Sequence, residues 1–524
     1  MKLFQSGFND KGRTDNVIRN VNVAAICQAF STVLGFVSRS FFISMLGETY
    51  LGINGVFSNI LTILNFAELG IGTAIIYNLY KPLREHDELR VASLVDFYKK
   101  AYFVIGGIIL AVGLLLTPFL SYLISEQPDV KESISLLYIL FLLSTVSSYF
   151  NAHKKSLLNA DQKSYIVNIY HQAMHALQII AQIVFLYVTR NYIVYLTIQI
   201  VFKLLENIFV AKQVDRLYPF LKKTKAQPLE KGFLSSIKKD VGALAIYKLN
   251  SAVIHGTDNI LITALETDGV RSVGLYANYT LISETLNTIL GLITNALTPS
   301  IGNLNTEKDV KKKESVFYTT LFTCAWLYGF ACTGILSLSE SFIKAWIGEK
   351  YVLAAPVVFV IALQLYIRSV HFAAYTYRVT NGLFVQSKYV PILTSVLNIV
   401  LSVVLGKMWG LFGILLATSI ARIFTIGISD PLFVYKYVFN KKPFAYYGHY
   451  LLYTALVLIC YFAADFVVGF IALEGWLGFI LSGIVFTLVF NGLFVLFTFK
   501  TQPFKFLLGK GKILLGKVLG KRIG

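Results

Sequence analysis

The chain has 524 residues, of which 56% are hydrophobic and only 14% are charged, whereas soluble globular proteins carry about 25% charged residues. This composition excludes an ordinary water-soluble protein. The formal net charge of +19 would suit a nucleic-acid-binding protein, but the positive charges follow membrane topology instead, and we expect no nucleic-acid partner.

Apolar runs long enough to cross a bilayer occur along the whole chain. A spanning helix needs about 20 mainly apolar residues, because its backbone must be hydrogen-bonded internally. We place fourteen spans at 21–46, 53–80, 101–124, 134–152, 165–189, 192–211, 241–265, 273–298, 316–338, 353–379, 389–406, 409–429, 449–471 and 476–499. The sequence therefore predicts an all-α polytopic membrane protein. The polar first twenty residues contain no apolar core with a cleavage site, so we expect no removable signal peptide.

The orientation follows from the basic residues. Of the 47 Lys and Arg residues, six fall in the predicted outer loops and most of the others in the two tails and the opposite loops. Lysine and arginine accumulate on the cytoplasmic side of membrane proteins. We therefore expect a multi-pass protein of the cytoplasmic membrane with both termini in the cytoplasm.

A basic, proline-containing stretch divides the chain into two groups of spans. The predicted parts are a cytoplasmic N-terminal tail (1–20), an N-lobe with spans 1–6 (21–211), a basic cytoplasmic linker (212–240), a C-lobe with spans 7–12 (241–429), spans 13 and 14 (430–499) and a cytoplasmic tail (500–524). In the tail, Lys510, Lys517 and Lys521 lie beside apolar residues, which is typical of a basic amphipathic segment on an anionic leaflet.

Weak internal similarity supports the two lobes. Residues 38–43 match 257–262 at an offset of 219, and 51–54 match 273–276 after a slip of three residues. Lys203 and Arg422 are again 219 residues apart. Both copies begin on the cytoplasmic side, so a duplication would give parallel lobes related by a pseudo-two-fold axis along the membrane normal.

Patterns typical of catalysis or metal binding are scarce. His171 and His175 have the spacing of a metal-binding pair, but no glutamate lies between them and no third ligand is evident. We interpret them as part of a polar helix face. The four cysteines all fall inside predicted spans, which indicates packing. We therefore expect neither an enzyme nor a bound metal or cofactor.

Ionisable residues inside spans are the most informative feature, because each costs about 2.5–3.5 kcal/mol at a helix centre and usually faces protein or water. The candidates are Arg39, Glu68, Lys203, Glu206, Lys248, Asp258, Glu284, Arg368, Arg422 and Asp465. Lys203 and Glu206 have the i, i+3 spacing of an internal ion pair. Arg378 and Asp465 lie near span ends, where snorkelling is the default.

Arg39, Lys248 and Arg368 have no opposite charge at helical spacing on their own spans. They predict a cationic cavity between the lobes, which would suit an anionic headgroup because these cations form charge-assisted bonds to phosphate oxygens. The alternative is snorkelling, or pairing across helices with Glu68 or Asp258. Those two carboxylates are alternatively candidates to bind a coupling ion, H⁺ or Na⁺.

Several segments resemble a known family. They are Arg39 to Gly47 with Tyr50-Leu51-Gly52-Ile53-Asn54-Gly55, Glu68-Leu69-Gly70-Ile71-Gly72-Thr73-Ala74-Ile75, and Gly256-Thr257-Asp258-Asn259-Ile260-Leu261-Ile262 with Val273-Gly274-Leu275-Tyr276. The chain resembles the Wzx-type polysaccharide flippases of the multidrug/oligosaccharidyl-lipid/polysaccharide exporter superfamily. The resemblance implies two six-helix lobes plus a final helix pair, as in the multidrug and toxin extrusion fold.

The same resemblance implies alternating access that moves a polyprenyl-diphosphate-linked oligosaccharide to the outer leaflet for capsule, exopolysaccharide, O-antigen or teichoic-acid assembly. Arg39, Lys248, Arg368 and Arg422 would hold the diphosphate or acidic sugars, and a polysaccharide polymerase and glycosyltransferases would be partners. Two alternatives remain: a cation-coupled multidrug and toxin extrusion antiporter, and a noncatalytic scaffold for envelope synthesis.

Overall fold

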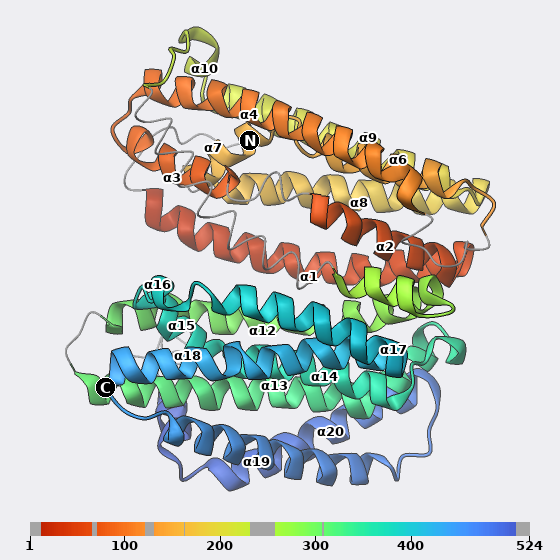
Figure 1. Ribbon diagram of the computed structural model, residues 1–524, viewed down its shortest axis with the longest axis vertical. Coiled ribbons are helices and arrows are strands. Elements are labelled where there is room, and N and C mark those ends of the chain that lie inside the picture. The colour runs from red at the N-terminus through yellow and green to blue at the C-terminus, as the bar shows by residue number, and fades with distance from the viewer. Residues whose placement is uncertain are drawn as a thin grey trace. The chain divides into compact units, whose positions relative to one another are not determined.

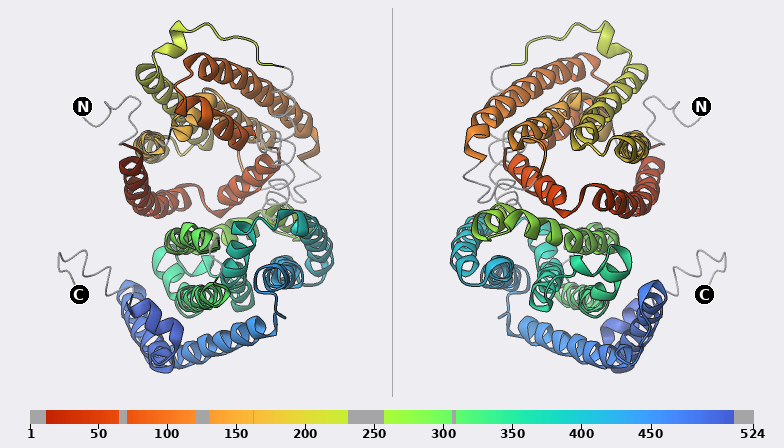
Figure 2. Two further views of the ribbon diagram at one scale, coloured as in Figure 1. Left: turned by 90° about the vertical axis from the view of Figure 1, so that its left-hand side faces the viewer. Right: turned by 90° about the vertical axis from the view of Figure 1, so that its right-hand side faces the viewer.

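The computed structural model describes residues 12–64, 71–120, 130–161, 163–230, 257–305 and 309–509. Those residues are almost entirely helical and contain no β-strand, which confirms the predicted all-α class. The chain forms two compact units, Met1–Gly274 and Leu275–Gly524, and within each unit long helices run alongside one another (Figures 1 and 2). The boundaries of the N-lobe and C-lobe given by the sequence analysis remain a prediction.

In unit 1 the helices are α1 (Gly12–Leu46), α2 (Glu48–Leu64), α3 (Ile71–Arg84), α4 (Glu88–Leu116), α6 (Ile134–Ser147), α7 (Ala152–Ala160), α8 (Ser164–Thr189), α9 (Tyr192–Leu217) and α10 (Phe220–Lys223), with a 3₁₀ turn at Thr117–Phe119. Residues 257–265 are also helical, and α12 (Gly269–Asn305) begins in this unit. Helix α8 packs between α1 and α9, and α6 packs on α9. Most of the predicted span 241–265 lies outside the described residues.

In unit 2 the helices after α12 are α13 (Val310–Trp346), α14 (Ala355–Val370), α15 (Phe372–Thr380), α16 (Phe384–Ser387), α17 (Val390–Phe424), α18 (Ile426–Val434), α19 (Phe444–Val468) and α20 (Gly475–Thr498), with a 3₁₀ turn at Glu349–Tyr351 and a π-helical turn at Tyr435–Phe439. Helix α13 packs against α14, α19 and α20. The final helix pair therefore lies against α13, and its bounds agree within about five residues with the predicted spans 449–471 and 476–499.

Helix α17 is two antiparallel helices joined at Gly410. This glycine has φ +56° and ψ −136°, which is not helical. Three residues later the chain has already folded back, because a methyl group added at Gly413 would lie 2.0 Å from the carbonyl oxygen of Leu405. Farther from the turn, Asn398 donates to the hydroxyl of Thr418 at 2.8 Å. The reversal falls at the break that the sequence predicts between spans 389–406 and 409–429.

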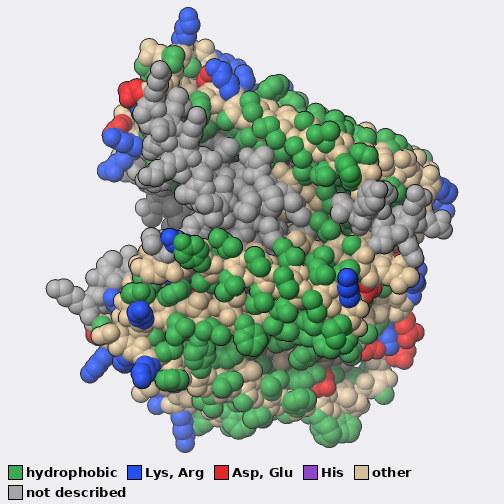
Figure 3. Space-filling model, in the orientation of Figure 1, with side chains coloured by type: hydrophobic (Ala, Val, Ile, Leu, Met, Phe, Trp, Pro, Cys, Tyr) green, Lys and Arg blue, Asp and Glu red, His purple; other side chains and the backbone are tan. Residues whose placement is uncertain are grey.

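On the face shown in Figure 3, apolar side chains cover most of the middle of the described surface, and most of the charged side chains lie toward its left and right edges. Within the described ranges, nine helical stretches are long and apolar enough to cross a membrane, or ten if the bent pair α6 and α7 forms one span. The chain is therefore a multi-pass membrane protein, although the count of fourteen spans and the cytoplasmic placement of both termini stay predictions.

The first turns of α12 approach α2 with almost no space between the backbones. A methyl group added at Gly52 would lie 1.8 Å from the carbonyl oxygen of Val270, and one added at Gly274 would lie 2.4 Å from that of Glu48. Small residues of this kind let membrane helices pack closely. Gly52 and Gly274 are also the two glycines that the sequence repeat matches to each other.

The predicted fourth span, 134–152, ends at a helix break in the structure, and the chain continues beyond it as α7. Helices α6 and α7 meet at an angle of 43°, and Asn151 at the break has a left-handed φ of +61°. A broken helix at membrane depth needs partners for its freed backbone groups. The side-chain amide of Asn207 on α9 supplies one by donating to the carbonyl oxygen of Ser147 at 2.7 Å.

The segment between α7 and α8 is fixed to the end of α9 by a buried tyrosine. The hydroxyl of Tyr218 donates to Asp161 Oδ2 at 2.6 Å, and Lys163 Nζ lies 2.7 Å from the same carboxylate oxygen. Burial, together with the negative charge of Asp161, holds the pKa of Tyr218 well above its usual value, so this hydroxyl remains a donor at neutral pH.

Candidate functional site

A polar seam runs along facing sides of α8 and α9 inside unit 1. Polar residues recur at helical spacing on both helices, so they share one face of each. The seam consists of His171, His175, Gln178 and Gln182 on α8, Tyr195, Gln199, Lys203 and Glu206 on α9, and Arg39 on α1. At 1.5 Å per residue it extends about 16 Å along α9, roughly half the hydrocarbon thickness of a bilayer.

One end of the seam is organised around Glu206. Its carboxylate lies 2.6 Å from Lys155 Nζ and 3.0 Å from His171 Nδ1. Lys155 comes from α7, so three helices meet at this carboxylate. Beside it is a cavity of about 200 Å³, lined by His171, Met174, His175, Gln178, Gln199, Phe202, Lys203 and Glu206, which has room for several water molecules.

The predicted pair between Lys203 and Glu206 is wrong. Glu206 forms its direct contacts with Lys155 and His171, and among the described residues of unit 1 Lys203 has no carboxylate within ion-pairing distance. The charge of Glu206 still lies close enough to interact electrostatically with Lys203. The reason is that Lys155, 51 residues earlier in the chain, reaches the carboxylate from α7. Lys203 is thus a cation of the seam without a direct ion-pair partner among the described residues, which spacing alone failed to indicate.

Arg39 lies at the other end of the seam. Its guanidinium is an electrostatic neighbour of Tyr195, whose hydroxyl is hydrogen-bonded to the side chain of Ser38. The ring of Phe42 packs on the Tyr195 ring with centroids 5.2 Å apart. One guanidinium nitrogen of Arg39, Nη1, is buried and has no hydrogen-bond partner among the described residues. Arg39 is therefore a second cation without an ion-pair partner there.

Glutamine side chains connect these two ends. Gln178 donates to Gln182 at 3.3 Å, and Gln182 donates to the backbone oxygen of Tyr195 at 3.1 Å. Gln199 donates to the Ser144 hydroxyl at 3.3 Å. Amide groups both donate and accept hydrogen bonds, so the seam between the cations presents groups that match the hydroxyls and amides of a sugar.

The predicted cations of unit 2 have neighbours of their own. Arg368 is exposed and lies 3.1 Å from Glu284, on α12. This pairing compensates the charge of Arg368 on its predicted span. The sequence alone indicated Glu68 and Asp258 as candidate partners across helices, but not Glu284. Arg422, on the second half of α17, is half-buried and is an electrostatic neighbour of His371.

The remaining predicted site residues are only partly described. Asp258 is buried at the start of the helical residues 257–265. Lys248 and Glu68 lie outside the described residues. The cationic cavity that would group Arg39, Lys248, Arg368 and Arg422 remains a prediction, as does a coupling-ion role for Glu68 or Asp258.

Arg378 does not snorkel, which corrects a second prediction. Its side chain is only 11% exposed and lies 2.8 Å from Asp430, which is 2% exposed. The guanidinium also donates to the hydroxyl of Ser387 at 2.7 Å. Asp430 comes from α18, so the partner lies 52 residues away and is invisible to helical spacing. Over the described ranges no cluster of three or more His, Cys, Asp or Glu is placed to hold a metal.

The described residues thus form an all-α, multi-pass membrane protein with a polar seam inside an apolar helical unit. Solved structures of similar fold match the chain. The lipid II flippase MurJ in an inward closed conformation aligns with TM-score 0.66 and 17% identity over 90% of this chain and 98% of its own. An inward-facing multidrug resistance MATE family transporter of the MOP superfamily aligns with TM-score 0.63 and 13% identity, over 76% and 93%.

A MATE structure in complex with MaL6 also aligns, with TM-score 0.54 and 14% identity over 79% of this chain and 94% of its own. No family model matches the chain, and no curated protein matches it. The likeness to MurJ and MATE structures shows a shared fold, in agreement with the architecture that the sequence resemblance implies. It does not single out the Wzx-type flippases within that superfamily.

Proposed function

We propose that the protein is a flippase that moves polyprenyl-diphosphate-linked oligosaccharide across the cytoplasmic membrane by alternating access, for assembly of a cell-surface polysaccharide. The observation that carries the proposal is the polar seam, in which Arg39 and Lys203 lack ion-pair partners among the described residues. The likeness of fold to a lipid II flippase over 90% of this chain supports it.

The chemistry of the seam favours an anionic, sugar-bearing cargo. A cation held away from bulk water without a counter-ion is unfavourable, and a bound phosphate or carboxylate would relieve that cost. Between the two cations, Gln178 and Gln199 offer hydrogen bonds to sugar hydroxyls. The lipid tail would remain in the bilayer while the headgroup follows the seam.

The other predicted residues have proposed roles in the same cycle. Lys248, Arg368 and Arg422 would contribute to holding the diphosphate or acidic sugars, with Arg368 exchanging Glu284 for the cargo. Glu68 or Asp258 would bind H⁺ or Na⁺ if transport is ion-coupled. A polymerase and glycosyltransferases would act on the product and supply the substrate, and both termini would lie in the cytoplasm.

The test is flipping of a fluorescent polyprenyl-diphosphate oligosaccharide in proteoliposomes that contain the purified protein. We expect Arg39→Gln and Lys203→Gln each to lower the initial rate at least tenfold, since each removes a charge that would face the cargo. Lys212→Gln is the matched control, because this exposed lysine lies on α9 outside the seam. Wild-type rates in both seam variants would refute the assignment of the seam.

The second candidate function is a cation-coupled multidrug and toxin extrusion antiporter, which the MATE-like fold favours. The unpaired charges of the seam are positive and its one carboxylate, Glu206, is already paired, so organic cations are the less suitable cargo. A deletion strain that becomes drug-sensitive while keeping its surface polysaccharide would support the antiporter.

Flipping by the purified protein alone would exclude a purely scaffolding role.

A further inference from the structure

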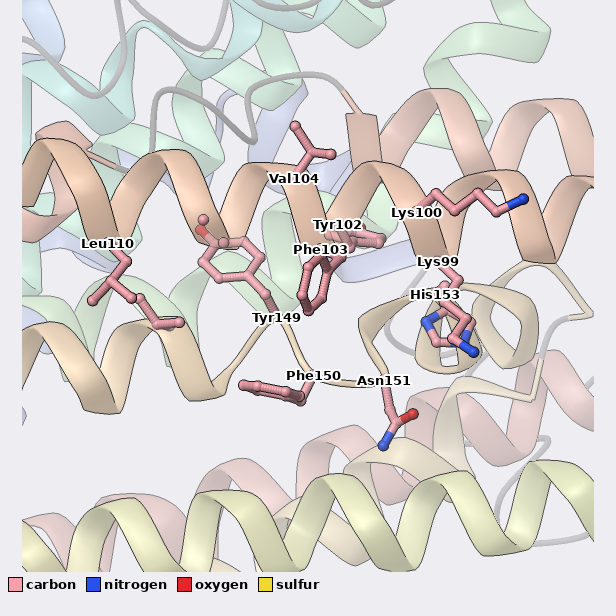
Figure 4. A pocket seen from close by; sticks show the side chains of 13 residues that line it. Lys99, Lys100, Tyr102, Phe103, Val104, Leu110, Tyr149, Phe150, Asn151 and His153 are labelled. Carbon is pink, nitrogen blue, oxygen red and sulfur yellow. The ribbon is translucent and has the colours of Figure 1, made fainter.

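An apolar groove on unit 1, which shares no lining residue with the cavity in the polar seam, lies between α4 and the break that separates α6 from α7. Its volume is about 620 Å³, and thirteen residues line it (Figure 4). Most of the lining is apolar, from Tyr102 and Phe103 to Leu110 on α4 and from Val146 to Phe150 beside the break.

The groove is charged at one end only. Lys99, Lys100, Asn151 and His153 lie toward one end in Figure 4, and Leu110 lies toward the other. Lys100 is 2.8 Å from Asp96, an exposed pair within α4. Lys99 has no acidic partner within ion-pairing distance in the described part of the chain. The groove therefore offers one full positive charge and one partly compensated charge to an anion.

The length of the groove matches one leaflet. From Lys99 to Leu110 the helix rises about 16 Å, and half of a 30 Å hydrocarbon core is about 15 Å. The two lysines precede the apolar part of α4, at the side that the positive-inside rule assigns to the cytoplasm. A charged headgroup at the lysines and one acyl chain along the groove would fit this arrangement.

Among the described residues, no side chain fills the middle of the groove. A methyl group added at Gly107 would meet no atom within 4 Å. The rings of Phe103 and Phe150 at its edges are 77% and 52% exposed. In a membrane, this space has to be occupied by lipid.

We propose that this groove is a specific binding site for an anionic glycerophospholipid of the cytoplasmic leaflet, with its phosphate at Lys99 and Lys100 and one acyl chain along Gly107. Anionic lipid attracts membrane-surface lysines by about 1 kcal/mol each. The groove is as long as a single leaflet, so a polyprenyl chain, which is much longer than an acyl chain, would overrun it. The bound lipid would bridge α4 and α7 across the helix break.

Native mass spectrometry of the purified full-length protein tests the proposal, with phosphatidylglycerol and phosphatidylcholine of identical chains added in detergent. We expect phosphatidylglycerol to be retained in preference to phosphatidylcholine. The double substitution Lys99→Gln/Lys100→Gln should weaken phosphatidylglycerol binding at least fivefold, since 1 kcal/mol corresponds to about fivefold in affinity. Lys388→Gln/Lys500→Gln, which changes two exposed lysines elsewhere, is the matched control and should have no effect.

Gly107→Leu tests the acyl chain separately from the charge. The new side chain would enter the groove without meeting protein atoms, and leucine suits a helix better than glycine, so the variant should fold. It should reduce retention of both lipids, whereas Gly492→Leu, at a helical glycine that also has no atom within 4 Å, should reduce neither.

Equal retention of the two lipids, or wild-type retention in both groove variants, would overturn the proposal. Preferential retention of a polyprenyl phosphate that is lost in Gly107→Leu would also overturn it, because the groove would then belong to the cargo. None of these outcomes depends on whether the protein flips oligosaccharides.

Discussion

Glu206 and Lys155 should be coupled energetically, and the structure sets the size of the effect. Their charged atoms lie 2.6 Å apart, and the side chains are 10% and 24% exposed. Breaking a fully buried pair costs about 3–5 kcal/mol, whereas exposed pairs contribute about 0.2–1 kcal/mol. Because this pair is mostly buried, we expect Glu206→Gln to lower the free energy of unfolding by about 2–3 kcal/mol, since it leaves Lys155 facing a neutral amide.

A double-mutant cycle isolates the interaction. Glu206→Gln, Lys155→Met and the double variant would be unfolded with SDS in mixed micelles, followed by far-ultraviolet circular dichroism. We expect a coupling energy of about 1.5–2.5 kcal/mol. Lys81 and Glu85 provide a control pair, 3.9 Å apart with side chains 83% and 56% exposed, for which the coupling should stay below about 0.5 kcal/mol. A similarly small coupling for Glu206 and Lys155 would refute this account of the seam.

Three further predictions concern packing and pairing, each measured by the same SDS unfolding. Gly52→Ala should lower the free energy of unfolding by at least about 2 kcal/mol, because its methyl group would lie 1.8 Å from a carbonyl oxygen. Gly492→Ala is the control and should not lower it, because no atom lies within 4 Å of that position. Equal effects of the two substitutions would contradict the close approach of α12 to α2. Arg378→Met should lower the free energy of unfolding by about 3 kcal/mol, and the double variant with Asp430→Asn should regain most of that free energy. If the effects of the two substitutions simply add, the two residues do not form a buried pair. Asn207→Leu should cost about 1–3 kcal/mol by leaving a carbonyl oxygen at the α6–α7 break unpaired, and an unchanged free energy of unfolding would show that water replaces the amide.

Hydropathy predicted most of the helices, because a spanning segment must satisfy its own backbone and so leaves a long apolar run. The spans 449–471 and 476–499 correspond to α19 and α20, and the short polar gap before 409 marks the reversal at Gly410. The same method ended the fourth span at 152, next to the break at residues 148–151, but did not predict α7, because this short helix carries His153, Lys154 and Lys155 and is not an apolar run.

For the candidate site, the sequence mainly failed to predict which charged residues pair with each other. Spacing joined Lys203 to Glu206 and left Arg378 without a counter-ion, whereas the structure pairs Glu206 with Lys155 and Arg378 with Asp430. Both true partners lie about fifty residues away on other helices, and spacing along one helix reports only on that helix. The polar seam itself was detectable, because polar residues recur about every fourth position on two consecutive spans.

The break between α6 and α7 has a mechanical consequence. Helix α7 is fastened to α9 at two successive lysines, with Lys154 held 2.6 Å from Asp215 and Lys155 held 2.6 Å from Glu206. A displacement of α9 must therefore carry α7 with it as a short rigid rod. The four residues 148–151, where the helical ladder is interrupted, are the pivot between α7 and α6, which itself packs on α9 and accepts a hydrogen bond from Asn207.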